Sequence, residues 1–197
     1  KKLISLLLCL TLLLSLTACG TGDSGETTVI ATAEPAQTEP TQAESAPEDG
    51  VYTVSTPDEF IEAIGSDRTI HVSGGTLDLS TARSYGKDTG NEKCAWEEEF
   101  DGYQLVIHDV KNLTITGDGK VATEIATQPR YAQVLYLRSC ENVALSGFTA
   151  GHTPEAGSCV GGVVYLEGCT GVSIRDVGLY GCGVIGVHTQ NCRDVTV

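Results

Sequence analysis

Four segments of the chain share one pattern of apolar residues and cysteines, and this repeat constrains the fold more than any other feature. The segments run over 105–115, 135–145, 164–174 and 187–197. Apolar and polar residues alternate in each half, as in a strand with one buried face, and steps of three residues around the central column indicate a bend. The five inward columns are Leu105, Leu135, Val164 and Val187; Ile107, Leu137, Leu166 and Thr189; Val110, Cys140, Cys169 and Cys192; Leu113, Val143, Val172 and Val195; and Ile115, Leu145, Ile174 and Val197.

The repeat predicts an all-β fold, a single-stranded right-handed parallel β-helix. The units follow one another at steps of 30, 29 and 23 residues, about one coil each, and parallel crossovers are right-handed by strong preference. A β-sandwich or another all-β fold is the alternative, but it does not need the same residue type at the same corner of each unit. In a stack of coils, equivalent positions lie about 4.8 Å apart. We therefore expect Cys140, Cys169 and Cys192 to point inward as a ladder of free, buried thiols.

A short helix is predicted to cap the N-terminal end of the coils. Thr56-Pro57-Asp58-Glu59 has the form of a capping box with proline at the first helical position. We expect an irregular first coil to follow, and then a long loop over 81–103. Because a β-helix that stopped at Val197 would leave its core open, we also expect further coils and a C-terminal cap beyond the given sequence.

Three other cysteines of the domain, Cys94, Cys159 and Cys182, lie off the ladder. An exported chain favours disulfides, and the pairing we favour is Cys159 with Cys182. No two cysteines after residue 50 have the Cys-x-x-Cys spacing of a zinc site. We expect no metal or other cofactor, and calcium only if missing coils supply carboxylates.

The first 19 residues have the pattern of an export signal. Two lysines precede an apolar run over 3–14, which is short for a membrane span of about 20 residues. Leu16-Thr17-Ala18-Cys19 resembles the lipobox of bacterial lipoproteins. The resemblance implies that Cys19 is lipidated and becomes the new N-terminus, which would anchor the chain to a membrane outside the cytoplasm. The alternative is an ordinary secretory signal with an incidental cysteine.

Residues 20–50 are predicted to be a disordered tether. They contain seven acidic residues, three prolines and no lysine or arginine, so they cannot bury enough surface to offset the entropy of ordering. The whole chain has a formal net charge of −14, and acidic residues also outnumber basic ones in the domain over 51–197. This charge argues against nucleic acid as a partner and against an anionic membrane surface as a docking site.

The domain resembles the pectin-lyase-like right-handed β-helix proteins. The similarity is carried by the helical cap and by three stretches: GYQLVIHDVKNLTITGDG, PRYAQVLYLRSCENVALSGFTAGHT and GGVVYLEGCTGVSIRDVGLYGCG. The resemblance covers about 50–197 and implies the fold. It does not imply one activity, because this fold carries lyases, hydrolases, epimerases and binding proteins.

The outward residues of the first strand in each unit form the predicted binding face. One ladder contains Val106, Tyr136, Tyr165 and His188, and the neighbouring ladder contains His108, Arg138, Glu167 and Gln190. Aromatic rings beside polar groups suit the apolar faces and hydroxyl rims of sugars, and the resemblance implies that polysaccharides lie on this face. The alternative is that a loop or another subunit covers the tyrosines.

Loops that we expect beside this face supply the remaining candidates. His152 is a candidate acid or base, Arg130 could neutralise an acidic sugar, and Tyr131 and Glu155 could contact substrate. His152, Arg130 and Glu167 are therefore the candidate catalytic residues, although a histidine in a glycine-rich loop is more often a turn or packing residue.

The sequence favours a lipid-anchored module that binds carbohydrate. A polysaccharide lyase or glycoside hydrolase is the first alternative, since Glu155 and Glu167 are the only nearby carboxylate pair and a hydrolase needs two. A structural or adhesive surface spacer is the second alternative. Oligomeric state stays open.

Overall fold

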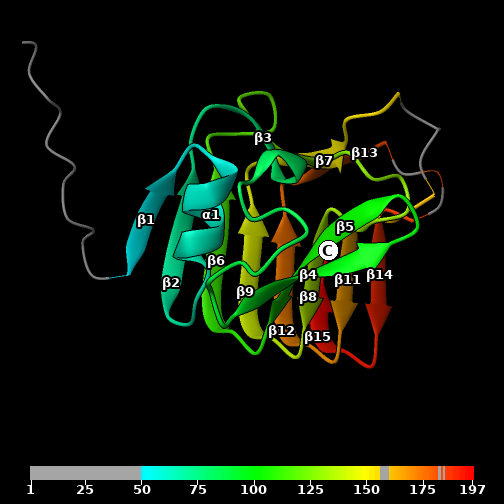
Figure 1. Cartoon of the computed structure of the whole chain (residues 1–197). Helices are drawn as coiled ribbons and strands as arrows, with labels where there is room; N and C mark the ends of the chain where they lie inside the picture. Colours follow the sequence, from blue (N-terminus) through cyan, green and yellow to red (C-terminus); the bar gives the residue numbers. More distant parts are fainter. Residues whose placement is uncertain (1–49, 156–159, 182, 184) are drawn as a thin grey trace, which may run out of the picture. The chain divides into compact units, whose positions relative to one another are not determined.

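A computed structural model describes residues 50–155, 160–181, 183 and 185–197. The described residues belong to one compact unit, Glu44–Val197. Cys19, the tether up to residue 49, and the expected Cys159–Cys182 disulfide lie outside them. Strands dominate the described unit, and they form three sheets in which nearly all pairs are parallel (Figure 1).

The N-terminal cap forms as predicted. Helix α1 (Pro57–Ala63) begins after Thr56, whose side chain accepts a hydrogen bond from the Glu59 amide. The Glu59 carboxylate accepts in return from the Thr56 amide, so both halves of the capping box are present. Phe60 and Ile61 on the buried face of α1 join the core.

The largest sheet, sheet A, contains the second strand of each repeat unit. Its strands lie in the order β1 (Val51–Val54), β2 (Arg68–Val72), β6 (Lys111–Gly117), β9 (Glu141–Ser146), β12 (Thr170–Arg175) and β15 (Arg193–Thr196). The register pairs Leu113 with Val143, and Val143 with Val172. The inward columns that the repeat predicted therefore stack from coil to coil.

Sheet C contains the first strand of each repeat unit. Its order is β14 (Val187–Gln190), β11 (Val164–Glu167), β8 (Leu135–Arg138), β5 (Gly102–His108) and β4 (Cys94–Glu99). Strand β4 corrects the expectation of a long loop over 81–103, because it pairs antiparallel with β5 along six residues. The Asp101-Gly102 dipeptide at the turn is a hairpin signal that the repeat pattern concealed.

A third strand in each coil forms sheet B, and the sequence analysis assigned two of these strands, around His152 and Tyr180, to loops. Its order is β13 (Gly178–Tyr180), β10 (Thr149–His152), β7 (Thr123–Thr127) and β3 (Gly75–Asp78), and the 3₁₀ helix η1 (Leu79–Thr81) follows β3. The chain thus passes from sheet C to sheet A to sheet B in each complete coil. Loops of unequal length return it from sheet B to the next strand of sheet C.

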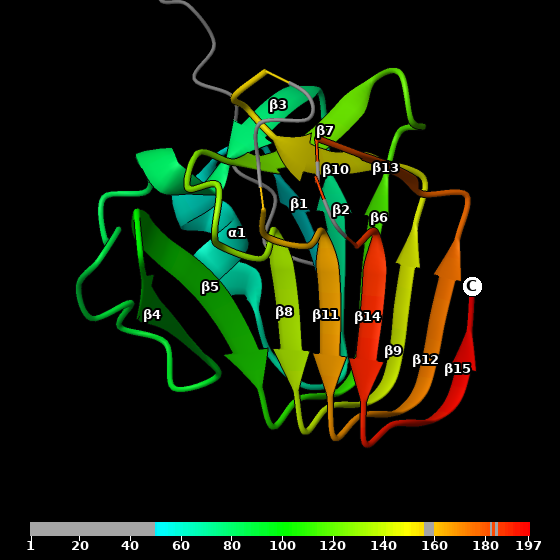
Figure 2. The same cartoon turned by 90° about the vertical axis from the view of Figure 1, so that its right-hand side faces the viewer.

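The corner between sheets C and A has the same backbone form in every coil. Figure 2 shows strands β8, β11 and β14 running down and turning directly into β9, β12 and β15. On either side of the central inward residue, one residue has a positive φ. Glycine, asparagine and aspartate tolerate this conformation best. The two stacked columns are Asp109, Ser139, Gly168 and Asn191, and Asn112, Asn142, Gly171 and Asp194.

The core between the sheets contains the predicted thiol ladder. Cys140 and Cys169 are buried, Cys192 is half-buried, and all three are free, as is the buried Cys94.

Among the described residues, no helix is long and apolar enough to cross a membrane.

Candidate functional site

The predicted aromatic ladder forms on the outer face of sheet C. Tyr136 pairs with Tyr165, and Tyr165 with His188. The ring centroids of Tyr136 and Tyr165 lie 4.6 Å apart, and those of Tyr165 and His188 lie 4.7 Å apart. Tyr165 therefore has a ring on each side.

The start of this face is covered, and Tyr136 is covered by residues of sheet C itself rather than by the loop or second subunit of the alternative interpretation. Val106 is 0% exposed and Tyr136 is 6% exposed. The guanidinium carbon of Arg138 lies 4.7 Å from the centre of the Tyr136 ring, while Tyr165 packs on the same ring. Since a sugar stacks on a free aromatic face, the ladder offers less free ring surface than its sequence pattern indicated.

Arg138 and Glu167 of the second ladder bind each other and neighbouring side chains. Arg138 donates two hydrogen bonds to Glu97 of strand β4, at 2.6 and 3.0 Å, and one to Glu167 at 3.0 Å. The Tyr136 hydroxyl donates to Glu167 at 2.5 Å. Hydrogen bonds from Tyr136 and Arg138 lower the pKa of Glu167, so this carboxylate is held in its charged form.

His152 occupies a different environment from the expected open loop. It is the last residue of strand β10, it is 0% exposed, and its Nε2 lies 3.0 Å from the carbonyl oxygen of Ala132. Its Nδ1 has no hydrogen-bond partner among the described residues, and burial lowers the pKa of the imidazole. This geometry favours the packing interpretation over acid–base chemistry on a polysaccharide.

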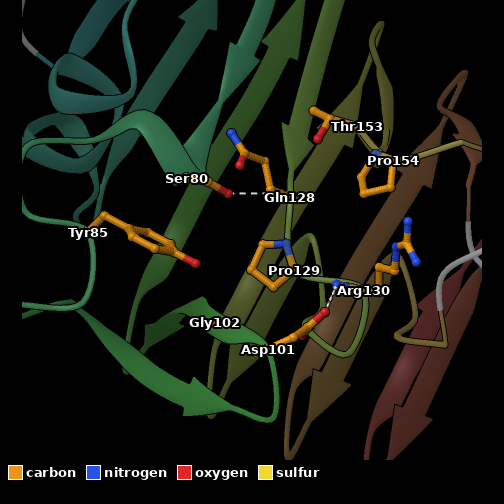
Figure 3. Close-up of a pocket in the computed structure, with 9 residues that line it drawn as sticks. All are labelled: Ser80, Tyr85, Asp101, Gly102, Gln128, Pro129, Arg130, Thr153 and Pro154. Atoms are coloured by element: carbon orange, nitrogen blue, oxygen red, sulfur yellow. Dashed lines mark hydrogen bonds between the residues drawn. The ribbon is translucent and has the colours of Figure 1, made fainter.

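Arg130 and Tyr131 lie in a second region, where the β4–β5 turn meets the loop between β7 and β8. Arg130 lines an open cavity of about 590 Å³ with neighbours from four parts of the chain (Figure 3). The neighbours are Ser80, Tyr85, Asp101, Gly102, Gln128, Pro129, Thr153 and Pro154. Tyr131 follows Arg130 in the chain. Its ring packs on that of Phe100, with 4.9 Å between the ring centroids.

The loop that carries Arg130 and Tyr131 is held in place by its backbone. The Asp101 carboxylate accepts from the amides of Arg130 and Tyr131, at 2.6 and 3.1 Å. The Arg130 carbonyl accepts from the amide of Val160 at 2.8 Å. The His152 ring bonds to Ala132 two residues further along. These contacts fix the direction of the loop before any ligand arrives.

Polar groups of the cavity remain available to a ligand. The Tyr85 hydroxyl accepts from the amide of Tyr103, which leaves its own proton free to be donated. Among the described residues, no acidic side chain pairs with the Arg130 guanidinium within 4.0 Å. Figure 3 shows the Arg130 side chain extending toward Pro154 while its amide meets Asp101. The cavity lining thus contains a carboxylate, a guanidinium and hydroxyl groups, and Phe100 and Tyr131 are the sequence neighbours of Asp101 and Arg130.

The sequence analysis missed Phe100 and Asp101, because the hairpin that carries them was taken for a loop. Phe100 is 85% exposed and Tyr131 46% exposed, so the pair presents ring surface to solvent. Gly102 is required at the cavity wall, since a Cβ there would lie 2.5 Å from the Tyr85 hydroxyl oxygen and 2.6 Å from Pro129 Cγ. Glu155, the remaining candidate, is exposed close to Pro154 in sequence.

Comparisons of the chain with protein-family models, with curated proteins and with solved structures found no match.

Proposed function

We propose that the domain is a right-handed parallel β-helix of the pectin-lyase-like kind that binds carbohydrate, held outside the cytoplasm by a lipid on Cys19. The β-helix proposal is supported by three sheets that each receive one strand per complete coil, in matching register. The acidic tether over 20–50 would hold the domain away from the membrane.

The binding proposal depends on one observation, the exposed Phe100–Tyr131 ring pair, whose two residues are the sequence neighbours of the cavity-lining Asp101 and Arg130. Sugar-binding sites combine aromatic surface for the apolar ring face with polar groups for the hydroxyls. The cavity supplies the Arg130 guanidinium, the Asp101 carboxylate and the Tyr85 hydroxyl at its wall. Because Arg130 has no acidic partner among the described residues, a saccharide with an acidic group fits this site best.

Binding is favoured over catalysis by the positions of the candidate catalytic residues. His152 is buried, and Glu167 is bonded to Tyr136 and Arg138. A hydrolase needs two carboxylates flanking one bond, and Asp101 is the only acidic residue among the described residues that line the cavity. A lyase or hydrolase is therefore the second candidate function. If no saccharide binds, we would infer the third, a structural spacer without a ligand.

The test is a saccharide array followed by isothermal titration calorimetry on the full chain. We expect Phe100→Ala and Tyr131→Ala each to weaken binding by about tenfold or more, as for a central aromatic contact. Tyr165→Ala is the matched control on sheet C and should leave affinity unchanged. No binding to any saccharide would refute the function, and loss of affinity in Tyr165→Ala alone would move the site to sheet C.

The charge preference has its own control. Arg130→Ala should weaken the binding of acidic saccharides more than the binding of neutral ones, because only an acidic saccharide loses an ion pair. Arg175→Ala removes an exposed arginine from sheet A, whose Nε bonds to Ser173, and should change neither. Equal effects of both variants would exclude a specific anion contact.

A further inference from the structure

The binding loop, residues 128–134, supplies two residues of the candidate site and is held from both sides. The Asp101 carboxylate accepts two of its backbone amides. From the following coil, the His152 Nε2 lies 3.0 Å from the Ala132 carbonyl oxygen, and it donates this hydrogen bond because a carbonyl can only accept. The register of sheet B pairs His152 with Thr127, the last residue of β7 before the loop. The position of the ring is therefore coupled to that of the binding loop.

The surroundings of the His152 ring leave little room for movement. The residue is 0% exposed. A Cβ on Gly181 would lie 3.0 Å from the His152 amide nitrogen, and a Cβ on Gly161 would lie 2.0 Å from the Ala132 carbonyl oxygen. Glycine at both positions allows the backbone to approach this closely. For the ring to reach water, the ring or the binding loop has to move.

The hydrogen bonds around the ring match its neutral form. Neutral imidazole donates through one nitrogen, whereas imidazolium donates through both. Nε2 donates to Ala132, and Nδ1 has no partner among the described residues. A proton on Nδ1 would add a buried donor without an acceptor and a buried positive charge, and both are costly. Protonation therefore favours an arrangement in which the ring reaches water and its bond to the loop is broken.

The charged and titratable groups around the ring do not reverse this effect. Burial lowers the pKa of His152, against the smaller opposing effects of its bond to Ala132 and of the negative charge on Asp101. Burial also raises the pKa of the Tyr180 hydroxyl, so this neighbour stays neutral. The titratable residues on the described elements next to the ring are Asp101 on the β4–β5 turn, Arg130 on the binding loop, Glu124 on β7, Tyr180 on β13 and Glu155 after β10.

We propose that His152 positions the binding loop for the saccharide, and that protonation of its ring releases the loop, so that binding is lost in acid. The inference rests on the proposed function, since the loop carries Arg130 and Tyr131. His152 acts through the loop and does not touch the saccharide. The neutral ring is the binding form, so affinity is full above the ordinary pKa of 6.5 and falls as pH drops through the lower, folded pKa.

The first measurement concerns the loop without any saccharide. Nuclear magnetic resonance follows the His152 ring and the amides of Arg130 and Tyr131 as pH is lowered from about 7.5 to about 5. We expect both amides to shift with the midpoint of the ring and to lose protection against solvent exchange below it. In His152→Gln, which keeps a neutral N–H donor, both amides should stay protected. His71→Gln is the matched control, because this histidine bonds to Asp118 at 2.8 Å, and it should leave the midpoint unchanged.

The second measurement is calorimetric titration with an acidic and a neutral saccharide over the same pH range. Below the midpoint of the ring, the Kd of both should rise by up to about tenfold per pH unit, because one proton must be lost on binding. His71→Gln should behave in the same way, whereas the Kd of His152→Gln should lack this component. By linkage, saturating saccharide should lower the midpoint of the His152 ring in the unaltered chain, which a histidine that only packs would not show.

The outcomes separate this proposal from the proposed function. Amides that do not follow the ring, or a ring midpoint that bound saccharide leaves unchanged, would overturn the role of His152 while saccharide binding itself stands. An equally steep pH dependence in His152→Gln would assign it to another group and also overturn that role. Absence of saccharide binding at every pH would refute the proposed function, and the amides would still decide whether His152 positions the loop.

Discussion

Replacing Asp101 should separate the cavity loop from the hairpin that holds it. The Asp101 carboxylate accepts the amides of Arg130 and Tyr131, at 2.6 and 3.1 Å. A hydrogen bond to a charged group contributes about 1.5–3 kcal/mol when it is protected from water. Asp101 is exposed, so water can replace much of each bond, and we take about 1 kcal/mol for each. Asp101→Ala should therefore lower the free energy of unfolding by about 2 kcal/mol.

The measurement is urea unfolding followed by circular dichroism, together with thermal unfolding. For a domain of this size, 2 kcal/mol corresponds to a fall in Tm of roughly 4–8 °C. Asp101→Asn retains one acceptor oxygen and should lose about half as much. Asp118→Ala is the matched control, because the side chain of this exposed aspartate has one partner within the described part of the chain, His71 at 2.8 Å. Its replacement should cost less than about 0.5 kcal/mol. Equal urea midpoints for Asp101→Ala and Asp118→Ala would refute the proposal that Asp101 holds the loop of Arg130 and Tyr131 in place.

Two further predictions concern His152 and Cys19. Burial holds the pKa of His152 below its ordinary value of 6.5, so the unfolded chain takes up its proton first as pH falls. The contribution of the neutral ring to stability is complete above about pH 6.5 and is lost as pH falls through the lower, folded pKa. NMR titration of the imidazole and urea midpoints at several pH values check this. A ring that titrates at pH 6.5 or above would contradict the prediction. Labelled palmitate should be incorporated into the full chain expressed in bacteria and not into the Cys19→Ser variant. Equal labelling of both would refute the proposal that a lipid on Cys19 anchors the chain.

The sequence predicted the stacking of the coils because the relevant forces are local and periodic. Two-residue alternation defines which side chains point inward, and the register in sheets A and C places the predicted columns next to each other. The capping box of α1 is equally local, since Thr56 and Glu59 contact each other within one turn. The thiol ladder was predicted for the same reason, as equivalent positions of stacked coils must be neighbours.

The third strand of each coil was missed because its pattern is weak. Strand β10 reads Thr149-Ala150-Gly151-His152, and strand β13 has only three residues. Gly151 leaves room for the Tyr180 ring of the next coil, which a Cβ would meet at 2.3 Å. Such a strand is stabilised by its neighbours in sheet B rather than by its own composition, so His152 looked like a loop residue.

The sequence by itself determined the inward columns, the corners, the cap and the order in which aromatic residues stack on sheet C. Only the tertiary structure decided which aromatic rings face solvent. Phe100 and Tyr131 are 31 positions apart and meet because the β4–β5 turn lies against the loop of the next coil, where Asp101 holds it. Tyr136 became buried because Arg138 and Tyr165 cover its ring. Periodicity specifies the face on which a residue lies, but the exposure of that face depends on long-range contacts that no local pattern encodes.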